Sequence, residues 1–375
     1  MGRPGILPGE PIDQAQPGET PGGPTGKMPV LRFVDMPLKP PLPPMEAKSV
    51  EAIPEGDEWQ YEPKWDGFRC IAFRDGDEIY LQSKAGQPLA RYFPDVVEAL
   101  SEVPAKKFVV DGELVIEVDG ALSFDELQLR LHPAASRVKK LAATHPAMMV
   151  VFDLLADENG ESLLALPLRE RRQKLERFAS KNLEGKGAIR LSPATTDLAK
   201  AKRWFDKVGG DLDGVIAMQI DAPYASGERT AMVKVKQIRT VDCVIGGFRY
   251  GTNSKVLGSL LLGLYDDAGL LHHVGFTSAF KKEDRQELTA KFNALKKAPG
   301  FTGNAPGGPS RWSTERSAEW EPVDPKTVVE VTYDHFTGGR FRHGTKILRW
   351  RNDKVPRQCT FDQVEGREGK SLALL

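Results

Sequence analysis

The sequence predicts an α+β protein of two domains, in which an antiparallel-sheet domain precedes a small β-barrel of the OB type. Three observations predict this architecture. The chain has 375 residues, which suits about two domains at roughly 150 residues each. Short apolar strands, Asp-Gly turns and helices alternate over residues 37–238. Several short strands and one helix occupy residues 239–375, a pattern that is typical of a small barrel.

The first segment, residues 1–36, is rich in proline and glycine and has no apolar periodicity. Such a segment cannot bury enough apolar surface to offset the entropy of ordering, so it predicts a disordered tail. Several prolines from Pro37 to Pro44 continue the extended character up to the first ordered element.

The first domain is expected to contain strands at the following positions: Gln60–Lys64, Phe68–Arg74, Glu78–Gln82, Phe108–Val110, Leu114–Val118, Met148–Leu155, Val215–Ile220 and Met232–Lys236. The turn at 75–77 reads Asp-Gly-Asp, a hairpin signature. Ser123 and Glu126 form a capping box, which predicts a helix from there to about Leu131. Further helices are expected at Pro94–Val103, Pro167–Phe178 and Asp197–Val208.

The second domain is expected to contain strands at these positions: Cys243–Tyr250, Ser259–Tyr265, Leu270–Thr277 and Thr327–Phe336. A turn at 266–269 separates two of them, and residues 282–297 have helical periodicity.

The charge distribution limits the classes of partner that the protein is expected to bind. The formal net charge is zero, which argues against a uniformly basic, histone-like surface. Local clustering is enough for nucleic-acid binding. Between His335 and Gln358 the only acid is Asp353, and the bases are Arg340, Arg342, Lys346, Arg349, Arg351, Lys354 and Arg357.

The location of the protein is expected to be cytoplasmic and away from membranes. No apolar run is long enough to span a bilayer. The three cysteines, Cys70, Cys243 and Cys359, are far apart and odd in number. Their spacing therefore predicts neither a disulfide framework nor a zinc ribbon.

The segment Lys64-Trp65-Asp66-Gly67-Phe68-Arg69 carries the chemistry. A lysine at the end of a strand, before a glycine turn, is held out of the sheet. It can attack phosphorus only as a neutral amine, so its pKa must be lowered by neighbouring positive charge or a metal. A hairpin turn with two solvated bases is the alternative.

This segment, with Tyr61-Glu62-Pro63 before it, resembles motif I of the covalent nucleotidyltransferases, which comprise DNA ligases, RNA ligases and mRNA capping enzymes. Matches to motifs III, IIIa, IV, V and VI follow in the family's order, at Asp111-Gly112-Glu113, Val151–Leu155, Asp213–Ala217, Lys234-Val235-Lys236 and Arg351–Lys354. The segments Arg340–His343 and Arg349–Arg351 are most similar to the short bacterial ligase C group of ATP-dependent DNA ligases. The resemblance implies a nucleotidyltransferase (adenylation) domain followed by an OB-fold domain.

The resemblance also implies residue roles. Lys64 is the nucleophile that carries AMP. Glu62 reads the adenine, Phe152 stacks on it, and Arg69 and Glu113 bind the ribose hydroxyls. Glu113 and Asp213 hold Mg²⁺ or Mn²⁺. The other expected nucleotide and phosphate contacts are Lys84, Arg229, Lys234, Lys236, Arg351 and Lys354.

Departures from the family pattern concern three positions. Asp213 stands where motif IV usually carries glutamate, and it reaches one methylene less. Met218 replaces a common lysine, so a contact from that position is not expected. Lys84 replaces an arginine in Ser83-Lys84-Ala85-Gly86, which keeps the charge but loses bidentate geometry.

The implied function is ATP-dependent sealing of 5′-phosphate and 3′-hydroxyl breaks in duplex DNA, in DNA repair. The expected protein is a monomer in the bacterial cytoplasm, at the nucleoid, with repair proteins as partners. Two alternatives stay open. One is an RNA ligase or capping guanylyltransferase, since the motifs overlap. The other is a nucleic-acid-binding OB protein whose transferase domain has decayed, against which Lys64, Glu113, Lys234 and Lys236 argue.

Overall fold

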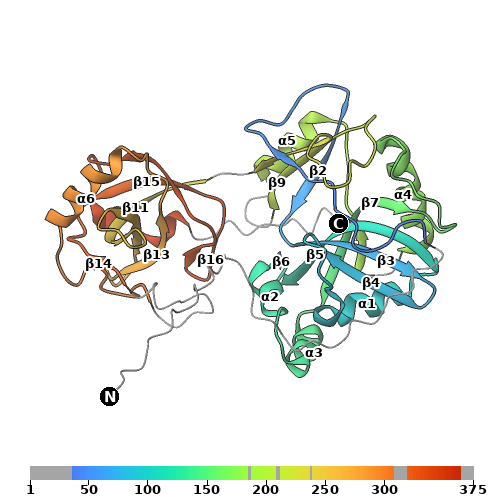
Figure 1. Cartoon of the computed structure of the whole chain (residues 1–375), viewed down its shortest axis with the longest axis horizontal. Coiled ribbons are helices and arrows are strands. Elements are labelled where there is room, and N and C mark those ends of the chain that lie inside the picture. The colour runs from blue at the N-terminus through green and yellow to red at the C-terminus, as the bar shows by residue number, and fades with distance from the viewer. Residues whose placement is uncertain (1–35, 185–186, 208–211, 237–238, 308–318, 365–375) are drawn as a thin grey trace, which may run out of the picture.

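The computed structural model describes residues 36–184, 187–207, 212–236, 239–307 and 319–364 (Figure 1). The predicted tail, residues 1–36, lies outside this part of the chain except for Met36, whose side chain is buried. Two bodies are seen side by side, and each has its own hydrophobic core. The mixed α+β fold, with an adenylation domain before an OB-fold region, confirms the predicted class. The predicted boundary between residues 238 and 239 stays a prediction.

Two sheets build the first domain. One has the order β1-β10-β9-β2 and the other β4-β3-β5-β7-β8, with β6 paired to β5. All neighbours are antiparallel except β1 with β10 and β7 with β8. The strands are β1 (Lys48–Ser49), β2 (Trp59–Trp65), β3 (Phe68–Asp75), β4 (Glu78–Ser83), β5 (Lys107–Val118), β6 (Ala121–Leu122), β7 (Ala147–Ala156), β8 (Ile189–Leu191), β9 (Leu212–Gln219) and β10 (Met232–Lys236).

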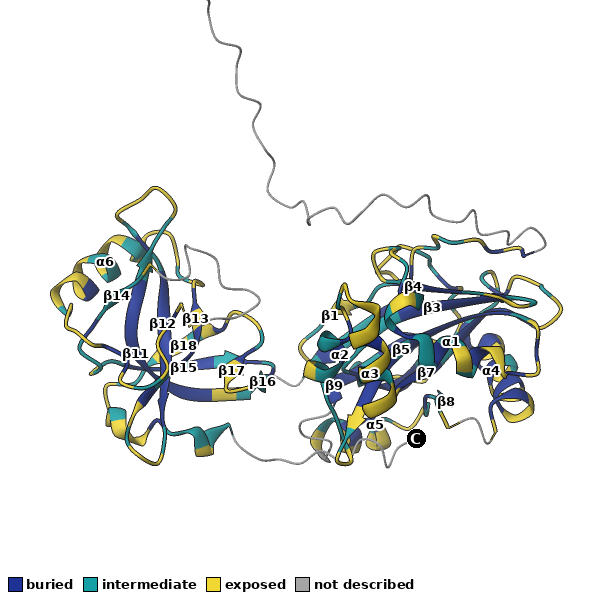
Figure 2. Cartoon of the chain, turned by 90° about the horizontal axis from the view of Figure 1, so that it is seen from below, coloured by how far each residue is buried: buried dark blue, intermediate teal, exposed yellow. Residues whose placement is uncertain are grey.

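The helices of the first domain are α1 (Pro94–Ser101), α2 (Phe124–Leu129), α3 (Ala135–Thr144), α4 (Leu168–Asn182) and α5 (Leu198–Lys207), with a 3₁₀ turn η1 (Ala90–Tyr92) (Figure 2). The helices α1, α2 and α4 pack apolar side chains on the second of these sheets, whereas α5 packs on β2 and β9 of the first sheet. The side chain of Ser123 accepts a hydrogen bond from the Glu126 N–H, as the capping box predicts. The helix α3 has no counterpart in the sequence prediction, because only Val138 of it is buried and its apolar stripe is correspondingly narrow.

The segment Asp111-Gly112-Glu113 does not separate two strands, and this part of the prediction is wrong. It lies within the single strand β5, which pairs continuously with β3. Gly112 serves close packing, since a Cβ there would lie 2.6 Å from the Val150 carbonyl oxygen. The irregularity falls instead in the pairing with β7, where the register shifts between Asp111 and Gly112.

The second domain is a curved sheet with the order β13-β12-β11-β15-β18, to which β14 is added beside β11. The strand predicted over 327–336 ends earlier, at Tyr333, and the chain then forms a small hairpin from β16 and β17. The elements are β11 (Arg239–Tyr250), β12 (Leu257–Tyr265), β13 (Leu271–Thr277), α6 (Asp284–Ala294), β14 (Glu321–Pro322), β15 (Val328–Tyr333), β16 (Phe336–Thr337), β17 (Arg340–Phe341), β18 (Lys346–Trp350), η2 (Pro356–Gln358) and η3 (Phe361–Gln363).

The hairpin β16–β17 lies on the side of the OB domain that faces the first domain, whereas α6 lies on the far side (Figures 1 and 2). Arg342, directly after β17, donates from Nη1 to both carboxylate oxygens of Asp66 at 2.8 Å. Its guanidinium also lies 3.8 Å from the centre of the Phe124 ring. The segment 334–342 is therefore the part of the OB domain that meets the adenylation domain.

Candidate active site

A cavity of about 510 Å³ opens between the two sheets of the first domain. Residues from β2 and β10 form one wall and residues from β3, β5 and β7 form another. The predicted residues that line it are Glu62, Lys64, Arg69, Lys84, Glu113, Phe152 and Lys234. Side chains that lie up to 172 residues apart in the chain thus meet in one place, since they run from 62 to 234.

Lys64 stands near the end of β2, and its Nζ lies 2.6 Å from Oδ2 of Asp213 on β9. Lys236 Nζ lies 3.1 Å from the same oxygen. The ring Nε2 of His335, from the OB domain, lies 3.0 Å from Oδ1. Asp213 is 6% exposed, so its carboxylate is poorly solvated. Its three partners compensate for the lost hydration.

Gly214 explains how Asp213 can reach this position. Its φ is +140°, and a Cβ would lie 1.9 Å from the Val235 carbonyl oxygen on β10. Only glycine fits there without displacing the neighbouring strand. Gly214 pairs with Lys64 on β2 and with Lys236 on β10, so the close approach of the strands at the glycine brings the two lysines to the aspartate.

The pKa of Lys64 is raised. Burial alone would lower it, but the charges of Asp213 and Glu113 outweigh burial. The same contacts, with the His335 hydrogen bond, hold the pKa of Asp213 well below its usual range against the opposing effect of burial. The expectation that neighbouring positive charge lowers the pKa of Lys64 is therefore wrong for this arrangement. The nearest charge to the amine is a carboxylate.

Two other carboxyl groups line the cavity, of which Glu62 is buried and Glu113 is partly buried. Burial raises the pKa of Glu62 to about 7, against the opposing charge of Arg172. Burial likewise raises the pKa of Glu113 to about 7, against the charges of Lys64 and Arg69. Glu62 accepts a hydrogen bond from Gln60 Nε2 at 3.0 Å. Each carboxyl can thus exchange between acceptor and donor near neutral pH.

Arg69 is tied to Asp111, a carboxylate of motif III to which the resemblance assigns no role. Its Nε and Nη2 donate to Asp111 at 2.6 Å each, and Asp111 is fully buried. The hydroxyl of Tyr224 donates to the same carboxylate at 2.5 Å. The Arg69 guanidinium also lies 4.5 Å from the centre of the Phe152 ring. Arg69 and Phe152 therefore form one stacked wall of the cavity.

Lys84 and Arg229 meet at the carboxylate of Glu46, which belongs to the segment before β1. Residues 44–47 of this segment line the cavity. The prolines of this region predict only an extended approach to the fold. No local pattern could have revealed its role, because the contacts of Glu46 lie 38 and 183 residues away.

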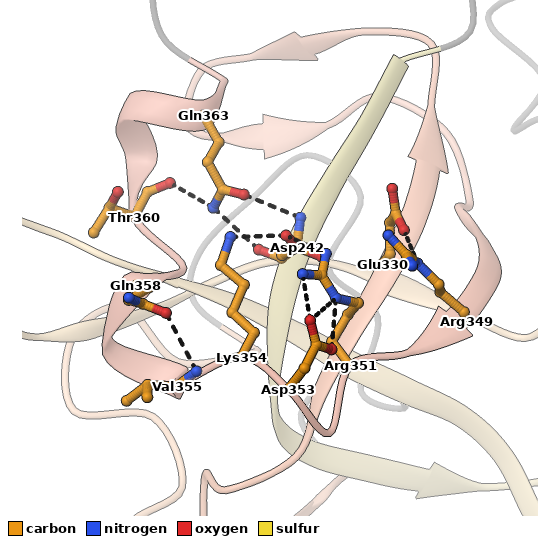
Figure 3. Close-up of polar contacts among 10 residues, drawn as sticks. All are labelled: Asp242, Glu330, Arg349, Arg351, Asp353, Lys354, Val355, Gln358, Thr360 and Gln363. Carbon is orange, nitrogen blue, oxygen red and sulfur yellow. Dashed lines mark hydrogen bonds and ion pairs between the residues drawn. The ribbon is translucent and has the colours of Figure 1, made fainter.

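Arg351 and Lys354 are turned toward their own domain (Figure 3). Arg351 pairs with Asp242 at 3.0 Å and with Asp353 at 2.9 Å. Lys354 Nζ lies 2.7 Å from Asp242. Neither residue is among the described residues that line the cavity. The structure thus brings motifs I to V together, and it places motif VI apart from them.

The OB-domain residues that contact the first domain include His335, Arg342 and Asp334, whose carboxylate lies 3.7 Å from Lys236 Nζ, and the sequence pattern assigns none of them a role there. His335 is 7% exposed. A single histidine after a strand carries no distinctive spacing, so only the docking of the two domains reveals its contact with Asp213. Within the described part of the chain, no helix is both long and apolar enough to cross a membrane.

Comparison with known proteins identifies the family. Residues 44–236 match the ATP dependent DNA ligase domain, and residues 253–354 match the ATP dependent DNA ligase C terminal region. DNA ligase C2 of Mycolicibacterium smegmatis is 45% identical over 349 residues, which cover 88% of this chain and 96% of that protein. DNA ligase C of Mycobacterium tuberculosis is 41% identical over 347 residues, with the same shares.

A solved structure from a study of Lig E DNA ligases covers 82% of this chain and 98% of its own, with a TM-score of 0.53 and 16% identity. That likeness supports the fold alone. The resemblance to the ligase C group, first seen in the motifs, is confirmed by the mycobacterial relatives. The chain belongs to the ATP-dependent DNA ligase family.

Proposed function

We propose that this chain seals 5′-phosphate/3′-hydroxyl breaks in duplex DNA with ATP, through an adenylate carried on Lys64. The observation that carries this proposal is the position of the Lys64 amine in the cavity, with Asp213, Glu113 and Lys234 around it. Family membership supports ATP as the nucleotide and DNA as the substrate.

Three displacements at phosphorus make up the reaction. The Lys64 amine attacks the ATP α-phosphorus, an N–P bond forms, and pyrophosphate leaves. The 5′-phosphate oxygen of DNA then attacks the same phosphorus, and Lys64 is released. Finally the 3′-hydroxyl oxygen attacks the 5′-phosphorus, and AMP departs. Charge develops on oxygen in each step, so positively charged side chains dominate catalysis.

The residues of the cavity fit these steps. Glu62 accepts a hydrogen bond from the adenine, Phe152 stacks on its ring, and Arg69 with Glu113 holds the ribose. Lys234 and Lys236 contact the α-phosphate. The pKa of Lys234 is already lowered by burial and by the nearby lysines. Lys84 and Arg229 contact phosphate at the cavity mouth.

A divalent cation fits Asp213 and Glu113, because Mg²⁺ and Mn²⁺ are usually held by one or two carboxylates together with substrate phosphates. When bound, the cation supplies positive charge to the phosphate oxygens. Lys64 must lose a proton and part from Asp213 before it attacks. Lys236 and His335 still compensate Asp213 when Lys64 departs.

The OB domain contributes Arg351 and Lys354 to the pyrophosphate in the first step. To do so, the domain must turn from the arrangement seen here, in which both residues pair with Asp242. We place the domain boundary at residues 238 and 239. We further propose a monomer that acts in DNA repair, with repair proteins as partners, in the bacterial cytoplasm at the nucleoid.

Covalent labelling tests this function. Incubation with α-labelled ATP should leave label on the denatured protein, incubation with α-labelled GTP should not, and nicked duplex DNA should be sealed. Label from GTP would point to a capping guanylyltransferase, and sealing restricted to RNA would point to an RNA ligase. No label from either nucleotide would point to a nucleic-acid-binding protein without catalysis.

A further inference from the structure

The segment before β1 is held firmly against the first domain. β1 pairs with β10 in parallel, and the backbone N–H of Glu46 donates to the Glu228 carbonyl at 2.8 Å. The backbone N–H of Met45 donates to the Tyr224 hydroxyl at 3.0 Å. Gln82 exchanges two hydrogen bonds with the Leu42 backbone, at 2.8 and 2.7 Å. The position of the Glu46 side chain is therefore set by backbone contacts on both sides.

One oxygen of Glu46 receives every hydrogen bond that the two neighbouring cations make to this residue. Oε2 accepts from Lys84 Nζ at 3.1 Å, from Arg229 Nε at 3.1 Å and from Arg229 Nη2 at 2.7 Å. These hydrogen bonds, first from Arg229 and then from Lys84, hold the pKa of the Glu46 carboxyl below its usual value. The arrangement has the form of an anion site, with a carboxylate oxygen where a phosphate oxygen would lie.

The ion pairs of Glu46 with Lys84 and Arg229 are easily exchanged for contacts with another anion. Lys84 is 60% exposed and Arg229 is 66% exposed, whereas Glu46 is 25% exposed. Exposed ion pairs contribute little, because water screens them and long side chains lose freedom. A phosphate group carries more charge than a carboxylate and matches the same arginine fork. A phosphate at the cavity mouth can therefore displace Glu46 from both cations.

We propose that Glu46 is a positioning residue whose carboxylate occupies a phosphate site formed by Lys84 and Arg229 until a substrate phosphate displaces it. This inference deepens the proposed function and rests on it. In this role, Glu46 keeps the two cations convergent and makes them selective for a group with more charge than a carboxylate. The phosphate comes either from the ATP triphosphate or from the 5′-end of the broken DNA strand.

The test is Glu46→Gln, which removes the charge and preserves shape. Two assays separate the phosphate sources. One measures KM and kcat for ATP in self-adenylation. The other measures binding of nicked duplex with either a 5′-phosphate or a 5′-hydroxyl, where a 3′-deoxy end prevents sealing. Glu55→Gln is the matched control, because Glu55 pairs with Lys202 at 2.9 Å on the surface and does not line the cavity.

Because the substrate no longer competes with a carboxylate, Glu46→Gln is expected to tighten binding in one assay by roughly 2- to 10-fold, the scale of exposed ion pairs. A lower KM for ATP at constant kcat assigns the site to the triphosphate. Tighter binding only of the 5′-phosphate nick assigns it to DNA. Glu55→Gln should change neither value, and Glu46→Asp, which keeps the charge, should lie nearer to the wild type.

Weaker or unchanged binding of both substrates by Glu46→Gln, with an unaltered thermal unfolding midpoint, would overturn the inference. Glu46 would then only fasten the segment before β1. If the wild type neither takes label from ATP nor seals nicks, the proposed function fails instead, so the two failures are distinguishable.

Discussion

The cavity of the first domain and the C-terminal basic segment of the OB domain both carry predicted site residues, yet these residues are arranged differently in the structure. At the cavity, Lys64 lines the wall, and Asp213 and Lys236 converge on it from two neighbouring strands. In the OB domain, Arg351 and Lys354 turn inward and share Asp242. Motif order along a chain therefore predicts what one domain assembles. It does not predict which face a second domain presents to it.

The largest expected effect lies in the cavity. Lys64→Ala should abolish labelling by α-labelled ATP, because no other amine is proposed as the nucleophile. The fold should be retained, since Lys236 and His335 still compensate Asp213 after the change. Intact-protein mass spectrometry would measure the adenylate.

Lys202→Ala is the control for this variant, because Lys202 is a half-exposed lysine that pairs with Glu55. It should be adenylated like the wild type. An adenylate on Lys64→Ala would mean that another residue is the nucleophile and that the assignment of Lys64 is wrong.

The second-largest effect is expected from the removal of divalent cations. Sealing should vanish in excess EDTA and return with Mg²⁺ or Mn²⁺. Mn²⁺ is expected to serve at least as well, because Asp213 reaches one methylene less than glutamate and Mg²⁺ demands stricter geometry. Gel assays of nick sealing give the measurement. Sealing that persists undiminished in EDTA would remove Asp213 and Glu113 from a metal role.

Charge removal in motif VI sharpens the comparison. Arg351→Gln with Lys354→Gln should slow self-adenylation, which releases pyrophosphate, and should matter much less for sealing of pre-adenylated DNA. One charge-assisted contact is worth about 1.5–3 kcal/mol, or roughly 10- to 150-fold in rate. Equal defects in both assays would make the two residues ordinary DNA contacts, with a shallower salt dependence of binding.

The structure adds a control to that experiment. The double variant leaves Asp242, which is 8% exposed, without its two cations, so some loss of stability is expected. Adding Asp242→Asn removes the uncompensated charge. Restored thermal stability without restored adenylation would separate the chemical role from the structural one.

A site residue could be predicted from the sequence where its role follows from a local pattern. It could not be predicted where its role depends on a contact with a residue far away in the chain. Lys64, Glu113 and Lys234 could be placed because a strand alternates its faces and a motif fixes which face is used. Glu46 and Asp111 could not, since Lys84 and Tyr224, which they contact, lie in loops far away in the sequence and follow no local pattern. His335 depends on domain docking, which no periodicity encodes. The pKa of Lys64 is raised rather than lowered, because Asp213, from a strand remote in the sequence, lies 2.6 Å from its amine.

The smallest expected effect concerns the contact between the domains. Arg342 and Asp66 are 11% and 15% exposed, and Nη1 of Arg342 donates to both carboxylate oxygens of Asp66. Arg342→Ala should loosen the docked arrangement, which small-angle X-ray scattering would detect as a larger radius of gyration. Arg349→Ala is the matched control, because Arg349 belongs to the same basic stretch but pairs with Glu330 inside the OB domain.

The direction of the effect on catalysis decides what the docked arrangement means. If the OB domain must turn to bring Arg351 and Lys354 to the cavity, weakening the Arg342 contact favours that turn. Self-adenylation should then rise about two- to tenfold, the scale of a partly exposed ion pair. A fall in self-adenylation at unchanged stability would instead place Arg342 within the catalytic machinery. The segment 334–342, rather than motif VI, would then be the part of the OB domain that acts on ATP.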